Sequence, residues 1–273
     1  MRLLPLILLA CAGEPTRVPP PESDTDTDTD ADSDTDTDTD ADTDSDTDTD
    51  SDTDADTVDI PAGAFTLGCD TCDADEAPAQ SVTLAAFAID RTEVSQADYD
   101  ACIQATVCTT PNTGTFDPTG SPDLPVGGVT WDQAVTYCGW MGGRLPTEAE
   151  WERACRGTTG GTYPWGDTAA DCTLASTNGC GGVMAVDSLP AGASPEGALH
   201  MAGNVWEWTA DWYAADTYST LDPTDPVGPA TGTARTYRGG SAGNDASLAR
   251  CSNRANTYAP DFGGSGLGFR CVY

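Results

Sequence analysis

The sequence predicts one loop-rich domain of short helices and short strands, held together by disulfide bonds. Three observations indicate this. Two helix start signals follow each other closely between residues 125 and 157, and ten of the eleven cysteines lie within residues 69–271. Residues 158–261 are rich in Gly, Pro, Asn, Asp and Thr and have few periodic apolar runs, which is typical of ordered loops.

Two helices are predicted by their capping signals. Thr130 with Gln133, and Thr147 with Glu150, form capping boxes that satisfy backbone N–H groups left unpaired in a first helical turn. We expect the first helix to begin at Trp131 and to end before the two glycines at 142 and 143. The expected buried faces are Trp131, Ala134, Val135, Cys138 and Met141 in the first helix, and Trp151, Ala154 and Cys155 in the second.

One further helix and four strands complete the expected elements. Ser95 with Asp98 caps a short helix whose inner face carries Tyr99, Cys102 and Ile103. Short apolar stretches predict strands over Ile60–Gly68, Ser81–Ile89, Arg235–Ser241 and Gly266–Tyr273.

The first eleven residues, MRLLPLILLAC, resemble a bacterial lipoprotein signal. The apolar run is too short to span a bilayer, and it ends in Leu-Leu-Ala-Cys. By this resemblance Cys11 becomes the acylated first residue, which anchors the protein to a membrane. Ala12 favours the outer membrane, so we expect a cell-envelope location, periplasmic or surface-exposed. The alternative is an ordinary cleaved secretion signal.

Residues 12–57 are expected to form an acidic stalk between the anchor and a domain over residues 58–273. Aspartate occupies every even position from 24 to 56, and these residues supply half of the net charge of −34. Like charges and missing apolar surface keep such a segment disordered. It is either a stalk that lifts the domain off a membrane or a merely tolerated spacer. The acidity argues against nucleic acid as a partner.

The cysteines after Cys11 predict a disulfide framework. Their even number in an exported chain allows up to five bridges, although spacing alone does not fix the pairing. Zinc is the rival interpretation for the pair Cys69 and Cys72. A second CxxC is missing and the chain has one histidine, which disfavours zinc.

Eight motifs in order resemble the formylglycine-generating enzyme family, also called sulfatase-modifying factors. They are IPAGAFTLG, FAIDRTEVSQADY, PVGGVTWDQAVTYC, GGRLPTEAEWERACRG, YPWGD, MAGNVWEWTADWY, RGGS and LGFRC. The resemblance covers Val58 to Tyr273. It implies an α+β, C-type-lectin-like fold with little regular secondary structure.

The resemblance also implies two disulfide bonds, and proximity suggests three more. By motif, Cys138 would pair with Cys271 and Cys155 with Cys251. The other six cysteines fall into local pairs, which are Cys69 with Cys72, Cys102 with Cys108, and Cys172 with Cys180.

The family's catalytic position is changed in this chain. Oxidising members carry a cysteine three residues after the serine of GGS and a second one a few residues on, and these hold copper, which needs soft thiolate ligands. Here that serine is Ser241 and the cysteine position is Asn244, so copper and formylglycine synthesis are not expected. Cys251 matches a structural cysteine instead. The resemblance implies a binding pocket that contains Ser241, Asn244 and Arg254, with Trp206 as a further candidate.

Two other branches of the family bear on function. A branch with histidine-ligated iron needs several histidines, and His200 is the only one here. Another branch, linked to maturation of a secreted siderophore chromophore, also lacks the cysteine pair, and the sequence does not discriminate for or against it.

The resemblance implies calcium at two places, through hard oxygen ligands. One set is the carbonyls of Gly203 and Val205 with the carboxylate of Glu207, although His200 replaces the usual Asn or Asp. The other is Asn178 with the carbonyl of Cys180. The alternative for Glu207 is a carboxylate satisfied by loop amides.

Trp206, Trp208 and Trp212 are either core or a carbohydrate-stacking platform, and the apolar filling that long loops need favours core. Arginines 238, 250, 254 and 270 are expected to pair with internal carboxylates. We therefore expect a binding or structural module for an unknown surface ligand or protein. The alternative is an oxidoreductase acting on exported proteins or small molecules.

Overall fold

The computed structural model describes residues 56–273. Residues 1–55, which include Cys11 and nearly all of the acidic segment, lie outside the described part. Between residues 56 and 273, no helix combines the length and the apolar character needed to cross a bilayer.

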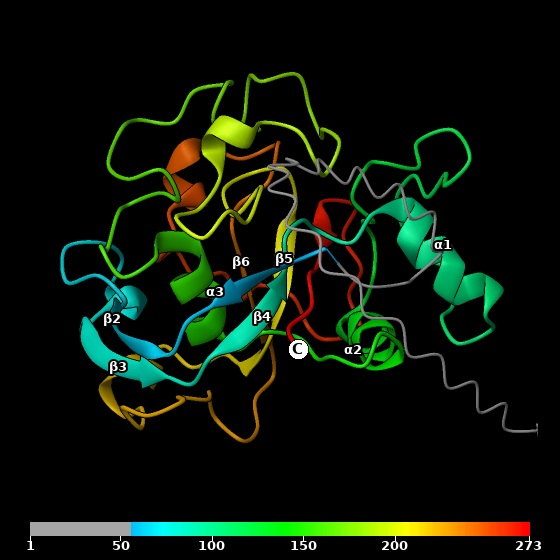
Figure 1. Ribbon diagram of the computed structural model, residues 1–273. Coiled ribbons are helices and arrows are strands. Elements are labelled where there is room, and N and C mark those ends of the chain that lie inside the picture. The colour runs from blue at the N-terminus through cyan, green and yellow to red at the C-terminus, as the bar shows by residue number, and fades with distance from the viewer. Residues whose placement is uncertain (1–55) are drawn as a thin grey trace, which may run out of the picture. The chain divides into compact units, whose positions relative to one another are not determined.

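Two short antiparallel ribbons open the domain. β1 (Thr57–Ile60) pairs with β4 (Phe87–Asp90), and β2 (Gly63–Leu67) pairs with β3 (Gln80–Leu84). The chain therefore runs out along β1 and β2 and returns along β3 and β4 (Figure 1).

The prediction of one strand over Ile60–Gly68 and one over Ser81–Ile89 was wrong in detail, because each stretch is divided in two. Pro61 separates β1 from β2, and proline has no N–H to donate to a strand ladder. On the return path, Ala85 donates its backbone N–H to Asp225 Oδ1 at 2.7 Å, outside the ribbons.

The three α-helices begin at the predicted caps. They are α1 (Gln96–Gln104), α2 (Trp131–Trp140) and α3 (Glu148–Arg156), and both capping boxes form in full. The predicted inner face of α2 needs one correction: Val135 is 39% exposed, whereas Tyr137 is buried. Single-turn 3-10 helices cover Ala74–Glu76, Pro190–Gly192, Thr217–Ser219 and Ala246–Ala249.

A three-stranded sheet lies at the centre. β5 (Trp206–Trp212) pairs antiparallel with β6 (Arg235–Arg238) and parallel with β7 (Leu267–Gly268). The two outer strands fall inside the predicted stretches but are shorter. β5 was not predicted, because buried acidic residues, Glu207 and Asp211, interrupt its apolar pattern.

The helices enclose the sheet from two sides. α1 and α2 lie together on one side, and α3 lies on the other, between the sheet and the β2–β3 ribbon (Figure 1). The largest core cluster fills the first side, where Tyr137 stacks on Tyr99 at 5.7 Å and meets Phe269 edge-on at 5.3 Å. Buried Trp151 leads the cluster on the second side.

Five disulfide bonds join all ten cysteines of the described part. Two are long-range: Cys138–Cys271 ties α2 to the carboxyl end, and Cys155–Cys251 ties α3 to the loop after β6. Three are local, namely Cys69–Cys72, Cys102–Cys108 and Cys172–Cys180. These are the five expected pairs. Bridges of this kind each stabilise a small exported domain by about 2–4 kcal/mol.

Candidate functional site

The turn from Ser241 to Asn244 follows β6, and it contains the position where the resemblance predicts a catalytic cysteine. Asn244 donates its backbone N–H to the Ser241 carbonyl at 2.9 Å, which closes the turn. The Ser241 hydroxyl donates to Asn244 Oδ1 at 2.6 Å. The two side chains therefore satisfy each other.

Three other segments hold this turn in place. Asn178 donates its N–H to the Asn244 carbonyl at 2.8 Å, and Ala242 donates its N–H to the Asn204 carbonyl at 2.9 Å. Gly266 lies close to the side chain of Ser241, since a methyl group added at Gly266 would be in van der Waals contact with it, at 3.8 Å. Trp206 donates its N–H to the Gly266 carbonyl, so the structure brings Ser241, Asn244 and Trp206 into one neighbourhood.

Asn204 is the buried support beneath the turn. Its backbone has φ 62°, in the left-handed region that asparagine tolerates better than most residues. Its Oδ1 accepts from the Met184 N–H at 2.8 Å, and its Nδ2 donates to Glu93 Oε2 at 2.7 Å. Glu93 also accepts from the Val205 N–H at 3.2 Å. Glu93 thus fixes two consecutive residues that precede β5.

Below Asn204 lies a buried group that we call the acid-rich cluster. Arg270 binds the Glu207 carboxylate with two parallel hydrogen bonds of 2.7 and 2.8 Å, and the Trp151 indole N–H donates to Glu207 at 2.7 Å. Burial, together with the Glu207 charge, raises the pKa of Glu93 well above its usual value. The cluster comprises Asp90, Glu93, Glu207 and Arg270.

The single histidine borders the acid-rich cluster. Burial, aided by the Arg270 charge, lowers the pKa of His200 to about 4. Its Nε2 lies 3.1 Å from the Ser188 hydroxyl and 3.2 Å from the Ala185 carbonyl. His200 is therefore neutral at physiological pH and is engaged by the loop that precedes it.

Arg254 does not join the candidate pocket. It binds both oxygens of Glu148, at 3.0 and 3.2 Å, and donates to the carbonyls of Asp75 and Ala214. Its side chain is fully buried. The predicted grouping of Arg254 with Ser241 and Asn244 is wrong, because the guanidinium is committed to an internal carboxylate.

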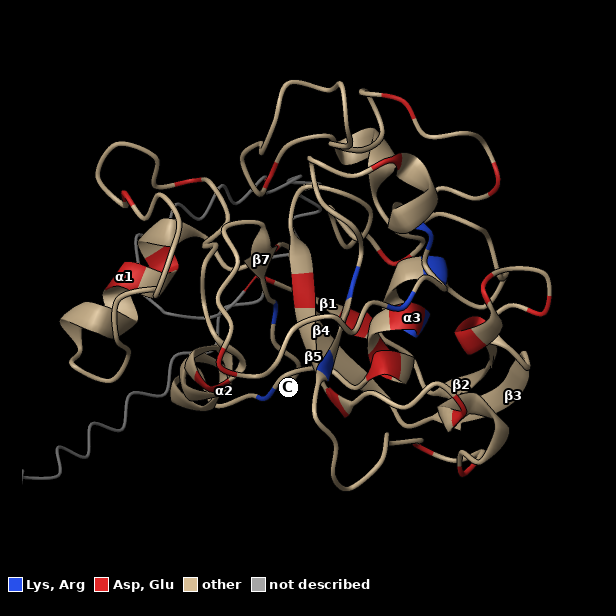
Figure 2. Cartoon of the chain, turned by 180° about the vertical axis from the view of Figure 1, so that it is seen from behind, with Lys and Arg blue, Asp and Glu red and all other residues tan. Residues whose placement is uncertain are grey.

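Arg254 belongs to a second buried group, the balanced cluster of Glu148, Glu152, Arg156, Arg238 and Arg254. Glu152 accepts from Arg156 at 2.8 Å, from Arg238 and from the Gly68 N–H. Burial opposes ionisation of Glu148, but the charges of Arg254 and Arg238 outweigh it and lower its pKa. Acidic and basic segments lie side by side around α3 in Figure 2. The predicted pairing of the four arginines is confirmed, with Arg250 bound to Asp73 and Glu76.

A small recess of about 60 Å³ opens near the Ser241 turn. Two of its lining residues connect it to the turn: Val205 follows Asn204, and Ser265 precedes Gly266. This volume is too small to enclose a drug-sized ligand, for which pockets of about 300–1,000 Å³ are usual. The other lining residues are Gln96, Thr115, Leu124, Pro125, Gly127 and Val183.

The donor set at the turn does not fit copper. Asn244 offers an amide oxygen that already accepts from Ser241, and Cys251 is bonded to Cys155. Every cysteine between residues 56 and 273 lies in a disulfide, so the described part offers no thiolate for Cu(I).

The two expected calcium sets differ in fit. At the first, Glu207 has both oxygens bound by Arg270 and Trp151, so the carboxylate is not free to coordinate an ion. At the second, Asn178 is exposed and its amide lies 3.3 Å from Asp245 Oδ1. The second set therefore keeps hard oxygen donors in one loop, and the first does not.

The three tryptophans of β5 are mainly core. Trp208 is fully buried, Trp206 packs edge-on against Tyr237 at 5.1 Å, and Trp212 stacks on Arg235 at 3.6 Å. Trp131 covers the other face of the same guanidinium at 3.7 Å. These contacts account for the rings without a carbohydrate.

Comparisons with known proteins agree with this architecture. Residues 42–273 match the model of the sulfatase-modifying factor enzyme 1-like domain, and the chain belongs to this formylglycine-generating enzyme family. A formylglycine-generating enzyme of Thermomonospora curvata is 34% identical over 79% of this chain and 92% of its own length.

Two solved structures share the fold. PvdO from Pseudomonas aeruginosa is 28% identical with a TM-score of 0.70, over 79% of this chain and 93% of its own. Variable protein 1 of Treponema denticola is 25% identical with a TM-score of 0.67, over 79% and 94%. This chain is therefore similar both to enzymes and to a protein described as variable.

Sequence reasoning missed Glu93 as a part of the site. The residue stands inside the motif FAIDRTEVSQADY, two positions before the cap of α1, where an acidic residue resembles ordinary helix-end chemistry. A long-range partner, Asn204, gives Glu93 its role, and no local pattern reports that partner.

Proposed function

We propose that this chain is a binding module of the formylglycine-generating enzyme family that has lost copper-dependent oxidation at the family's site. The observation that carries the proposal is Asn244 at the position of the catalytic thiolate. Its side chain is held by Ser241, and the remaining cysteines of the described domain are paired. Without a thiolate, the turn can position a partner but cannot bind Cu(I) for oxygen activation.

The proposed binding surface is the segment between the GGS and GFR motifs together with the recess beside it. Phe262 is 42% exposed and stacks on Tyr258 at 4.1 Å, and Tyr258 stacks on Tyr237 at 5.1 Å. A rigid exposed aromatic side chain offers contact area at low entropic cost. The small recess favours a macromolecular partner that inserts one side chain over a small enclosed ligand.

We further propose that Cys11 carries a lipid and that the acidic segment spaces the domain from the outer membrane. The sequence pattern around Cys11 supports the anchor, and the charge repulsion of the aspartates supports an extended spacer. Labelling cells with an alkyne fatty acid tests the anchor. The label should attach to the wild-type chain and be lost in Cys11→Ser, and equal labelling of both would refute it.

Free thiols and copper affinity test the loss of oxidation. The purified, unreduced protein is alkylated and each cysteine is counted by mass spectrometry, and Cu(I) is then titrated against a chromophoric chelator. We expect no free thiol at the ten cysteines from 69 to 271 and no copper retained. Two free thiols that include Cys251, with copper bound, would instead establish the oxidoreductase alternative.

A further inference from the structure

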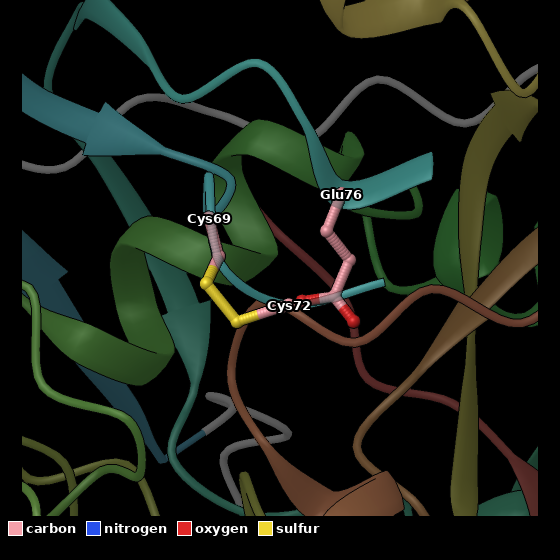
Figure 3. Close-up of side chains that lie close together, drawn as sticks. All are labelled: Cys69, Cys72 and Glu76. Atoms are coloured by element: carbon pink, nitrogen blue, oxygen red, sulfur yellow. A yellow bond between two sulfur atoms is a disulfide. The ribbon is translucent and has the colours of Figure 1, made fainter. Parts of the chain in front are cut away.

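The local disulfide Cys69–Cys72 lies at the surface of the domain. It follows β2 directly and precedes the 3-10 turn Ala74–Glu76. Cys72 is exposed and Cys69 is half-buried. The Cys69 N–H donates to the Glu76 carbonyl at 2.8 Å, which closes this loop and brings the Glu76 side chain beside the sulfur atoms (Figure 3).

Glu76 is a fully buried acid with one unsatisfied oxygen. Its Oε1 accepts from Arg250 at 2.5 Å and from Asn253 at 3.4 Å, but its Oε2 has no hydrogen-bond partner within the described residues. An oxygen of this carboxylate lies within 4.8 Å of both sulfur atoms. The disulfide therefore sits next to a buried acceptor that lacks a donor.

Two hydroxyl groups also approach the sulfur atoms. Thr71 Oγ1 lies 3.7 Å from Cys69 Sγ, and the Ser252 hydroxyl donates to Cys72 Sγ at 4.0 Å. Hydroxyl donors of this kind stabilise the negative charge that a sulfur atom acquires when a disulfide opens. Each of the two sulfur atoms therefore has a hydroxyl group nearby that can stabilise it after the disulfide is reduced.

We propose that Cys69–Cys72 is a thiol–disulfide exchange centre that accepts two electrons from a pair of cysteine thiols in another exported polypeptide. A substrate thiolate attacks the exposed Cys72 Sγ, the bond to Cys69 breaks, and Cys69 leaves as a thiolate that takes a proton. The second substrate thiolate attacks the substrate sulfur of the mixed disulfide and displaces Cys72. The substrate gains a disulfide, and this chain gains two thiols.

Glu76 drives this exchange toward the reduced form of the pair. A disulfide has no S–H, so it cannot satisfy Glu76 Oε2, and an unsatisfied buried acceptor is costly. Each thiol formed by reduction carries an S–H donor, and each sulfur lies within 4.8 Å of a Glu76 carboxylate oxygen, so rotation of the opened side chains can bring an S–H group to Oε2. Reduction therefore adds a hydrogen bond that the oxidised state lacks, which makes this bridge the best oxidant among the exposed ones.

The chain contains a matched comparison for this effect. Cys172–Cys180 is also local, with one exposed and one half-buried cysteine. Within residues 56–273, no acid lies within 4.8 Å of both of its sulfur atoms, because the only such group there is Cys69, Cys72 and Glu76. If exposure alone governed reduction, the two bridges would open together.

Graded reduction of the purified full chain tests the proposal. Dithiothreitol is raised in steps, the reaction is quenched by alkylation, and mass spectrometry reports the redox state of every cysteine. We expect Cys69–Cys72 to open at about tenfold lower dithiothreitol than Cys172–Cys180. Opening at the same concentration would overturn the proposal, since solvent access would then explain both.

Two variants separate the role of Glu76 from general destabilisation. Glu76→Gln should move the opening of Cys69–Cys72 toward that of Cys172–Cys180. The control is Glu196→Gln, since Glu196 also pairs with an arginine and has an unsatisfied Oε2, but belongs to no cysteine-containing group of this kind. The control should leave the opening unchanged, and an equal shift in both variants would contradict a specific role.

A stoichiometric reaction tests the chemistry without any change at Glu76. A reduced peptide with two cysteines is mixed with the oxidised chain, and the oxidised peptide is measured by mass. The wild-type chain and the double variant Cys172→Ser, Cys180→Ser should oxidise the peptide. The double variant Cys69→Ser, Cys72→Ser should not, and peptide oxidation that persists in it would exclude this centre.

Discussion

The acid-rich and balanced clusters are both buried groups of acids and arginines. The pKa values of their acids nevertheless shift in opposite directions. In the balanced cluster, Arg156, Arg238 and Arg254 meet two glutamates, and the pKa of Glu148 falls. In the acid-rich cluster, Arg270 is the single base among three acids, so burial raises the pKa of Asp90 to about 6 and raises that of Glu93 well above its usual value. The ratio of bases to acids decides the outcome.

This difference separates two structural roles. The balanced cluster lies between α3 and β6 and fastens the scaffold, because each of its charges has a partner of opposite sign. The acid-rich cluster supports Asn204 and, through it, the Ser241 turn. The candidate site therefore rests on acids whose raised pKa values bring their protonation closer to neutral pH.

The largest effect should follow from breaking the balanced cluster. Glu152→Ala removes the carboxylate shared by Arg156 and Arg238, both buried, and leaves them without their partner. Loss of one member of a buried pair typically costs about 3–5 kcal/mol of unfolding free energy. Urea unfolding measures it, and Asp56→Ala, in an exposed pair with Arg91, should cost at most about 1 kcal/mol. Equal effects would refute the proposed division.

A matched pair of variants sharpens the comparison inside the acid-rich cluster. Glu207→Gln removes the negative charge that pairs with buried Arg270 and should destabilise the domain by about 3 kcal/mol. Glu93→Gln should cost only about 1 kcal/mol, since its raised pKa already favours the neutral carboxyl. The same urea assay ranks them, and a larger loss in Glu93→Gln would show that Glu93 is the charged partner.

Particular residues show which parts of the fold can be predicted from the sequence. The capping boxes at Thr130 and Thr147 place α2 and α3 because a helix start is local chemistry between residues three apart. β5 escaped prediction because Glu207 and Asp211 point into the interior, where distant partners satisfy them. Elements held by neighbours along the chain can be predicted, and elements held by long-range polar contacts cannot.

The same distinction applies to the candidate site. Motif order grouped Ser241 with Asn244, and the two residues do contact each other, because four consecutive residues form one turn. The expectation for Arg254 failed because Glu148, which is 106 positions away, binds it. Pairing of Arg270 with a carboxylate was expected from the acidity of the domain, but its partner Glu207 was assigned to calcium instead.

The pH dependence of His200 provides the next test. Its pKa falls from 6.5 to about 4 in the folded state, so the unfolded chain binds more protons between those values. The neutral form thus contributes stability that is complete above about pH 6.5 and is lost as pH falls through 4, up to about 3 kcal/mol. His200→Asn, which tolerates the local φ of 54°, removes this dependence.

Between pH 7.5 and pH 4, the wild type should therefore lose up to about 3 kcal/mol of unfolding free energy relative to His200→Asn. Urea unfolding of both proteins across this range measures it. The raised pKa values of Asp90, Glu93 and Asp211 have the opposite sign, but they act in both proteins and largely cancel in the difference. A pH-independent difference would show that His200 titrates normally in the folded state.

The smallest expected effect concerns calcium at Asn178. The loop offers the Asn178 amide oxygen, the Cys180 carbonyl and the nearby Asp245 carboxylate, and it is already shaped by the Cys172–Cys180 bridge. An ion with so few protein ligands should bind weakly. At calcium tenfold above a dissociation constant, binding adds about 1.4 kcal/mol, which raises the melting temperature by about 3–6 °C for a domain of this size.

Melting curves with calcium and with a chelator measure this shift. Asn178→Ala should abolish it, whereas Asn112→Ala, in another loop, should leave it intact. The comparison also separates the two expected calcium sets, because Glu207→Gln should keep the shift if Arg270 holds that carboxylate away from the ion. Loss of the shift in Glu207→Gln alone would place the ion at β5, and the acid-rich cluster would then gain its missing positive charge from the metal.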